Sequence, residues 1–258
     1  MTQPFIGRRL LAVFAHPDDE AYAAAGLMAW CLAEGAEVFL LCLSRGEGGR
    51  PHPRSGVEVA PETLGDHRWG ELKAACAAIG CPPPLGRGLP DGRIEDHLDD
   101  AAGAVQMARD RLQPDVVVTL GPDGAYGHRD HVACTAAVTR GAQGLRVLHA
   151  AFPPGMFTPI RRALKRHLGS SGLAPLPPGG LGVPLKSADI VLDLGAYPEL
   201  RTIKQATLAA HRSQLAKGDP LSFLRPGLVF PLLQREAFVV AEGPPLPHPG
   251  ADLFAGLP

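Results

Sequence analysis

Short apolar runs alternate along the chain with longer segments whose apolar residues recur at helical spacing. The short runs are typical of buried strands, which we expect at residues 10–15, 37–43, 85–89, 115–120, 146–152, 189–194 and 235–240. Helices are expected between them, at residues 21–34, 66–79, 97–112, 131–141, 158–167 and 197–215. This alternation predicts an α/β fold with a doubly wound, mostly parallel, Rossmann-like sheet.

The order of the expected elements shows no internal repeat and no clear boundary between domains. We therefore expect one domain over residues 1–258, in which a core at about 9–152 is followed by a C-terminal part, 153–258, that completes the pocket and the sheet. In that second part the pattern loosens, with a basic helix expected at 158–167 and a loop or lid at 169–182.

Composition narrows the class of partner. Hydrophobic residues make up 45% of the 258, which is ample for a core, and the mean hydropathy is +0.04. The net charge of −1 gives no general attraction to nucleic acid or to an anionic membrane. No apolar run approaches the roughly 18 residues of a membrane span, and the run at 10–15 is too short for a signal peptide. We therefore expect a cytoplasmic protein with neither nucleic acid nor membrane as a partner.

The cysteines predict a reducing environment. There are five, an odd number, and no two form a Cys-x-x-Cys pair. We interpret them as buried thiols and not as a disulfide framework, which also makes a redox protein the less favoured class.

Two of the expected strands end in clusters of histidine and aspartate. The run at 10–15 leads into His16-Pro17-Asp18-Asp19-Glu20, and the run at 116–120 is followed by Tyr126-Gly127-His128-Arg129-Asp130-His131. Each cluster precedes an alanine-rich, helix-like segment. Because the carboxyl ends of parallel strands meet at one edge of a sheet, the two clusters predict a metal site at that edge.

Each cluster also has a structural alternative. Pro17 with either following Asp makes a turn and a helix cap, and the second cluster makes a polar loop. The glycine-rich loop at 44–56 suggests nucleotide binding, but a dinucleotide fingerprint requires Gly-x-Gly-x-x-Gly after the first strand, where this chain has His-Pro-Asp-Asp-Glu. Since both clusters follow apolar strands, we favour a site over two turns.

Catalytic zinc takes about three protein ligands from His, Asp and Glu, and leaves one position for water. Four residues are well placed to serve: His16, Asp18, Asp19 and His131. Successive residues in a loop point in different directions, so one Asp can bind the metal while the other accepts a proton from the activated water.

These motifs resemble the LmbE/PIG-L-like family of zinc-dependent N-deacetylases, of the N-acetylglucosaminyl deacetylase type. The resemblance extends over about residues 9–240 and includes Arg68, Glu71, Leu72, Lys204, Ala209, His211, Ser213 and Gln214. Arg129 departs from the family pattern, in which proline is usual. Lys204 and His211 lie seven residues apart on one expected helix and share a face, which we interpret as support for the site.

The resemblance implies Zn²⁺ as the cofactor, with His16, Asp19 and His131 as ligands and Asp18 as general base. Tyr126 is expected to donate its hydroxyl to the oxyanion, and His128 to protonate the leaving amine with Asp130 holding its ring. A bell-shaped pH–rate profile, with a basic limb from His128, follows.

Substrate recognition is assigned to two further residues. By the resemblance, Arg68 and Asp91 contact the sugar. The implied function is a metal-dependent hydrolase that removes an acetyl group from a small N-acetylglucosamine-type substrate, in a chain that forms a possible homo-oligomer. Two alternatives remain at this point: an amidase acting on a thiol conjugate, and a catalytically silent sugar- or nucleotide-binding module of the same fold.

Overall fold

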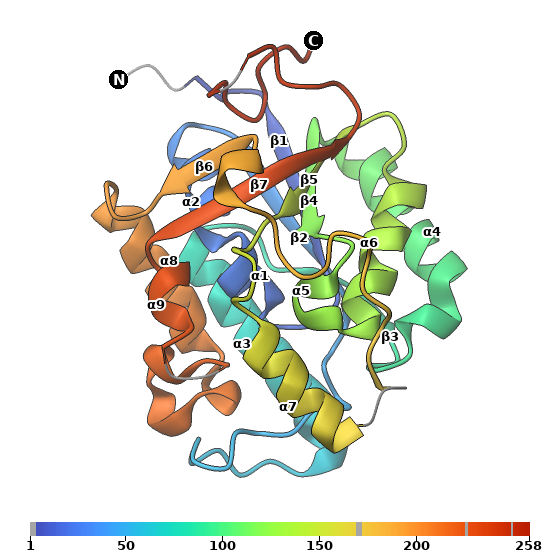
Figure 1. Ribbon diagram of the computed structural model, residues 1–258, viewed down its shortest axis with the longest axis vertical. Helices are drawn as coiled ribbons and strands as arrows, with labels where there is room; N and C mark the ends of the chain where they lie inside the picture. The colour runs from blue at the N-terminus through green and yellow to red at the C-terminus, as the bar shows by residue number, and fades with distance from the viewer. Residues whose placement is uncertain (1–3, 169–171, 225–226, 249) are drawn as a thin grey trace.

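A computed structural model describes residues 4–168, 172–224, 227–248 and 250–258. Its seven strands form one sheet in the order β3-β2-β1-β4-β5-β7-β6 (Figure 1). The strands are β1 (Arg9–Phe14), β2 (Glu37–Ser44), β3 (Leu85–Leu89), β4 (Val116–Leu120), β5 (Arg146–Ala150), β6 (Ile190–Asp193) and β7 (Arg235–Glu242). The first five are parallel, and β7 pairs antiparallel with both β5 and β6. The predicted α/β fold with a mostly parallel sheet is confirmed.

Helices cover both faces of this sheet (Figure 1). They are α1 (Asp19–Ala23), α2 (Ala25–Ala33), α3 (Leu64–Ile79), α4 (Leu98–Leu112), α5 (Gly124–Gly127), α6 (Arg129–Gly141), α7 (Thr158–Leu168), α8 (Pro198–Ala210) and α9 (Val229–Leu232). None of the described helices is long and apolar enough to cross a membrane.

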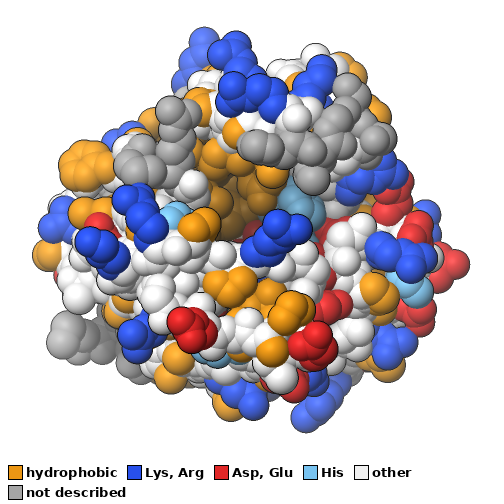
Figure 2. Space-filling view, turned by 90° about the horizontal axis from the view of Figure 1, so that it is seen from below, with side chains coloured by type: hydrophobic (Ala, Val, Ile, Leu, Met, Phe, Trp, Pro, Cys, Tyr) orange, Lys and Arg blue, Asp and Glu red, His pale blue; other side chains and the backbone are white. Residues whose placement is uncertain are grey.

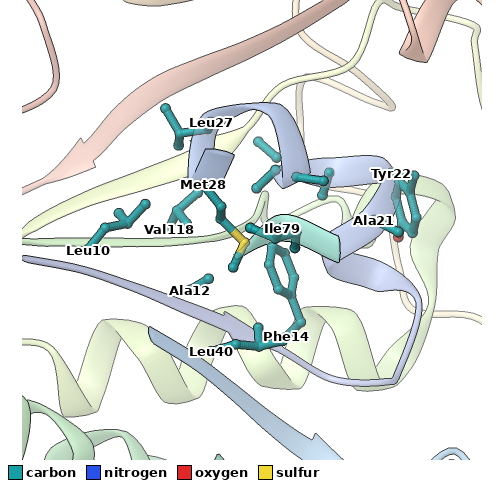
Figure 3. Close-up of a cluster of buried hydrophobic side chains, with 14 of the residues drawn as sticks. Leu10, Ala12, Phe14, Ala21, Tyr22, Leu27, Met28, Leu40, Ile79 and Val118 are labelled. Atoms are coloured by element: carbon teal, nitrogen blue, oxygen red, sulfur yellow. The ribbon is translucent and has the colours of Figure 1, made fainter. Parts of the chain in front are cut away.

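Alternating side chains of β1 build the two halves of the core. Leu10, Ala12 and Phe14 pack in a cluster with α2 and α3, part of which is drawn in Figure 3. Leu11 and Val13 point the other way, into a second cluster with α4 and α6. This period of two, on a strand buried on both faces, explains why the run at 10–15 is continuously apolar.

The helix expected at 21–34 is two helices, broken at Ala24, whose φ is −149°. The carboxylate of Glu236 accepts hydrogen bonds from the backbone N–H groups of Gly26 and Leu27, at 2.8 and 2.7 Å. It therefore caps the new helix start from about 210 residues away along the chain, a partner that local sequence does not reveal.

The end of α8 also differs from the prediction. The helix expected at 197–215 stops at Ala210, and residues 212–214 form a separate short turn, η5 (Arg212–Gln214). The basic helix expected at 158–167 is present as α7. Of the expected loop or lid, 169–171 lie outside the described residues, and Leu173 forms a single antiparallel bridge with His128.

Candidate metal centre and active site

Both predicted motifs lie at the carboxyl edge of the sheet, because β1 and β4 are neighbours in it. His16, Asp19 and His131 are all buried there. The Nδ1 atom of His16 lies 3.2 Å from Nε2 of His131 and 3.6 Å from Oδ2 of Asp19. Nε2 of His131 lies 3.1 Å from Oδ1 of Asp19. Zinc–ligand bonds of 2.0–2.2 Å at tetrahedral angles place ligand atoms about 3.3–3.6 Å apart, so this spacing suits such an ion.

The outer nitrogens of both imidazole rings are occupied by acceptors. Nδ1 of His131 lies 3.1 Å from the carbonyl oxygen of Gly124. Nε2 of His16 lies 2.9 Å from Oδ1 of Asp91 and 3.2 Å from Oδ2 of Asp130. Because carbonyls and carboxylates only accept, these outer nitrogens carry the protons. The inner nitrogens, Nδ1 of His16 and Nε2 of His131, face each other and the carboxylate of Asp19.

Charge at this centre favours a cation. Burial opposes a positive charge on His16, but the carboxylates of Asp130, Asp19 and Asp91 outweigh it and raise its pKa well above the ordinary value. Burial likewise opposes ionisation of Asp19, but His131 and His16 hold its pKa well below the usual range. Its two oxygens also accept from the backbone N–H of His16 and the hydroxyl of Tyr22, both at 3.0 Å.

Asp18, the expected general base, stands beside this group in an unusual backbone conformation. Its φ is +106°, a left-handed value that non-glycine residues rarely adopt. Its Oδ2 lies 3.1 Å from Nη2 of Arg68. Burial raises the pKa of Asp18 to about 6, against the opposing charge of Arg68. A carboxyl group with that pKa is suited to proton transfer near neutral pH.

Arg68 and Asp91, expected to contact the sugar, are bound within the centre. The buried guanidinium of Arg68 also donates to the carbonyl oxygens of Gly46 and Pro17, at 2.8 and 2.6 Å. Gly46 has a φ of +69°, and a Cβ there would lie 2.2 Å from Nη1 of Arg68, so a larger residue would be strained and would displace the guanidinium. Asp91 accepts from the N–H of Gly48 in addition to His16. Their contact with a sugar stays a prediction.

Asp130 corrects a sequence-based expectation. Its carboxylate does not hold the ring of His128; it faces His16 and accepts from the N–H groups of Gly92 and Ile94, at 2.6 and 3.1 Å. The residue is buried at the start of α6, where it is turned toward β1 and the loop after β3. Asp130 and Asp91 thus fix the ring of His16 through its outer nitrogen, as carboxylates do for histidines at metal sites.

His128 stacks on His131, with ring centroids 4.6 Å apart, and its Nδ1 accepts from the N–H of Asp130 at 3.3 Å. Burial lowers the pKa of His128 well below the ordinary value, and the neighbouring His131 and His16 act in the same direction. The expectation that Asp130 favours the charged form of His128 is therefore wrong. The lowered pKa favours the neutral ring, and because Nδ1 accepts from Asp130, the proton of the neutral ring is on Nε2.

Tyr126 packs against the same rings, with its centroid 5.3 Å from that of His131. Burial, followed by the charge of Asp19, raises the pKa of Tyr126 well above its ordinary value, so the hydroxyl stays a donor. Arg129, the departure from the family pattern, lies on the exterior, where its Nε atom donates to Glu95 at 2.8 Å.

The sequence drew attention to three residues on α8 and just after it without revealing their partners. Each binds a buried carboxylate: Lys204 binds Glu236 at 2.5 Å, His211 binds Glu20 at 2.5 Å, and Ser213 binds Glu71 at 2.7 Å. Glu20, the last residue of the first motif, and Tyr22 are the neighbours of the centre that sequence reasoning missed. The only signal was that Glu20 directly follows Asp19.

The carboxyl ends of the parallel strands point toward the lower face of Figure 1. Figure 2 shows that face, with a hollow that has a hydrophobic floor, a histidine at its edge and several Lys and Arg side chains around it. The loop after β2 is joined to the loop after β3, because the N–H of Asp91 donates to Glu47 at 2.9 Å. Arg161 of α7 donates to the carbonyl oxygen of Tyr126 at 3.2 Å, which ties α7 to the second motif.

Comparison with known proteins agrees with this arrangement. Residues 11–142 match the model of the PIG-L family, described as GlcNAc-PI de-N-acetylase, and this range holds both motifs. The chain belongs to the PIG-L family. A relative from Mycobacteroides abscessus, named 1D-myo-inositol 2-acetamido-2-deoxy-alpha-D-glucopyranoside deacetylase, is 31% identical over 97% of this chain and 98% of its own length.

Solved structures show how widely this PIG-L fold is used. The N,N'-diacetylchitobiose deacetylase from Pyrococcus horikoshii aligns with a TM-score of 0.61 and 20% identity, over 90% of this chain and 82% of its own. A 4-carboxy-2-hydroxymuconate hydratase, GalB, aligns with a TM-score of 0.55 and 17% identity, over 93% and 99%. Since a hydratase shares the fold, the reaction must be argued from the site.

Proposed function

We propose that this protein is a zinc-dependent N-deacetylase that hydrolyses the acetamide of an N-acetylglucosamine-type substrate. The observation that carries the proposal is the convergence of Nδ1 of His16, Nε2 of His131 and the Asp19 carboxylate, whose closest atoms lie 3.1–3.6 Å apart. The carboxylates around these nitrogens favour a positive charge among them, which a metal ion supplies. Two imidazole nitrogens and a carboxylate form a donor set that zinc prefers.

The ligands of the proposed ion would be His16, Asp19 and His131, with Asp91 and Asp130 orienting His16. When bound, zinc would polarise the amide carbonyl and bring the pKa of a coordinated water to about 7. Every other step is assigned to residues of the chain itself.

Asp18 accepts the proton of the attacking water and passes it to the leaving amine, a double role suited to its pKa of about 6. The hydroxyl of Tyr126 donates to the carbonyl oxygen as that atom gains negative charge. The ring of His128 keeps its Nε2 proton and serves as a hydrogen-bond donor. Its lowered pKa disfavours the imidazolium form, so we do not assign it the transfer of a proton to the amine.

The substrate class follows from the relatives. Proteins about 30% identical over nearly the whole chain are named for deacetylation of a glucosaminide linked to inositol, and we propose a substrate of that kind. The single-domain organisation, the cytoplasmic location, the possible homo-oligomer and the lack of nucleic acid or membrane partners stay predictions.

The proposed function is tested by incubating the zinc-loaded protein with three substrates: the inositol glucosaminide, N,N'-diacetylchitobiose and an N-acetylcysteine thioether. We expect equal amounts of acetate and free amine from at least one glucosaminide. Hydrolysis of the amide in the thioether substrate, with no reaction of either glucosaminide, would favour the thiol-conjugate amidase. No release from any substrate by fully metallated protein would favour the silent binding module.

One prediction tests whether Asp91 orients His16 at the zinc site or binds the sugar. Because its carboxylate accepts the outer N–H of His16, Asp91→Asn is expected to weaken zinc binding about 10- to 100-fold, as loss of such a partner does at other zinc sites. Competition with a coloured chelator measures this. Asp96→Asn, on an exposed carboxylate that pairs with Arg93, is the control. A raised KM with unchanged zinc affinity would return Asp91 to the sugar.

A second prediction concerns His128. Its lowered pKa favours the uncharged ring at neutral pH, so we expect the basic limb of the pH–rate profile to come from another group. A cation on His16 and His131 would lower this pKa further. His128→Gln is expected to reduce kcat about 10²-fold or more while leaving the basic limb where it was. A basic limb that disappears in this variant would show that His128 reacts as an imidazolium.

A further inference from the structure

The peptide group that joins Pro17 to Asp18 is held on both sides by buried, oppositely charged side chains. Its carbonyl oxygen accepts from Nη2 of Arg68 at 2.6 Å. Its N–H donates to Oε2 of Glu20 at 3.0 Å. A peptide dipole between a cation at its oxygen and an anion at its N–H has one strongly preferred orientation.

That orientation decides where Asp18 points. The φ angle of Asp18 turns about the bond that begins at this same N–H, and its value of +106° is unfavourable for a residue with a Cβ. Such strain persists only where the surroundings over-determine it, and it is often found at active sites. If this peptide group turned over, φ would relax and the Asp18 carboxylate would leave Arg68.

Glu20 is in turn held by His211. Oε1 of Glu20 lies 2.5 Å from Nε2 of His211, and both side chains are fully buried. His211 follows the last residue of α8, so it approaches the first motif from 191 residues away. Its other nitrogen, Nδ1, has no hydrogen-bond partner among the described residues. Among the described residues, the contact with Glu20 is therefore the hydrogen bond that holds this buried ring.

We propose that His211 is a positioning residue for the deacetylation: through Glu20 it fixes the Pro17–Asp18 peptide and so aims the general base at the substrate. The inference rests on the proposed function, because it gives His211 a task only where Asp18 transfers a proton. The raised pKa of His211, where the charge of Glu20 overcomes the effect of burial, agrees with a charge-assisted contact.

Two substitutions of His211 isolate the contact with Glu20. In His211→Gln the amide nitrogen reaches about as far as Nε2 and can still donate to Glu20. In His211→Asn the amide reaches only the position of Nδ1, and Glu20 loses its partner. Thr207→Val is the matched control, since Thr207 is buried one turn earlier on α8 and its hydroxyl donates to the carbonyl oxygen of Ile203 within the helix.

The zinc-loaded variants are assayed with the inositol glucosaminide, at a temperature where each is fully folded. We expect His211→Asn to lower kcat about 100-fold, the loss typical of a catalytic group displaced by about 1 Å, with KM and zinc content within about twofold of the parent. His211→Gln should recover most of kcat, and Thr207→Val should match the parent. Equal kcat in the Asn and Gln variants would overturn the proposal.

Crystal structures of the same variants supply a readout that does not depend on activity. In His211→Asn, φ of Asp18 should leave the left-handed region and its carboxylate should separate from Arg68; in His211→Gln both should stay. An unchanged Asp18 in His211→Asn would refute the positioning role, whatever the rate. If the parent protein proves inactive on every glucosaminide, the proposed function fails, and these structures still decide whether His211 fixes the peptide.

Discussion

Replacing Asp18 by Asn is expected to lower kcat by about 10²- to 10⁴-fold while zinc stays bound, the range found for loss of a positioned general base. The amide of Asn keeps the size of the side chain but cannot accept a proton. Asp18 is not one of the proposed zinc ligands, which are His16, Asp19 and His131, so the metal content should not change. Kinetics and metal analysis on the same preparation measure both quantities.

The pH dependence of the parent gives a further check on Asp18. A carboxyl group must be ionised to accept a proton, so activity should fall as the pH drops through its pKa. That acidic limb should be absent in Asp18→Asn. The matched control is Asp19→Asn, which should lose the metal itself. Equal loss of metal in both variants would mean that the two carboxylates have been assigned to the wrong roles.

Replacing His131 by Ala is expected to weaken zinc binding by more than about 100-fold and to abolish measurable activity. Loss of a partner that merely orients a ligand costs about 10- to 100-fold in affinity, and removal of a ligand should cost more. Chelator competition followed by elemental analysis measures the change. His97→Ala, at the start of α4 where the ring pairs with Asp100, should bind zinc like the parent. Full occupancy in His131→Ala would refute the ligand assignment.

The sequence predicted the fold and the meeting of the two motifs at one edge of the sheet, because both follow from short-range patterns. Continuous apolar runs indicate strands buried on both faces, and His and Asp at two strand ends indicate one shared edge. The break at Ala24 was not predictable, since Glu236 caps α2 from the far end of the chain. The same holds for Asp130: it stands two residues after His128, but its carboxylate meets His16, which is 114 residues away along the chain.

For some residues the sequence indicates that they matter but does not show which residues they contact. Lys204, His211 and Ser213 were recognisable as a group, but only the structure shows that each binds a buried carboxylate. Partners of buried charges lie far apart in sequence because they join separate elements. A single sequence therefore indicates which residues matter before it indicates what they contact.

The central claim is that one zinc ion, held by His16, Asp19 and His131, is required for deacetylation. The most direct test is to strip the protein with a chelator, add zinc in steps, and follow acetate release from the inositol glucosaminide together with bound metal. We predict no activity without metal and a linear recovery that reaches its maximum at one equivalent of zinc per chain. Full activity in the stripped protein, or recovery that does not follow bound zinc, would contradict the account.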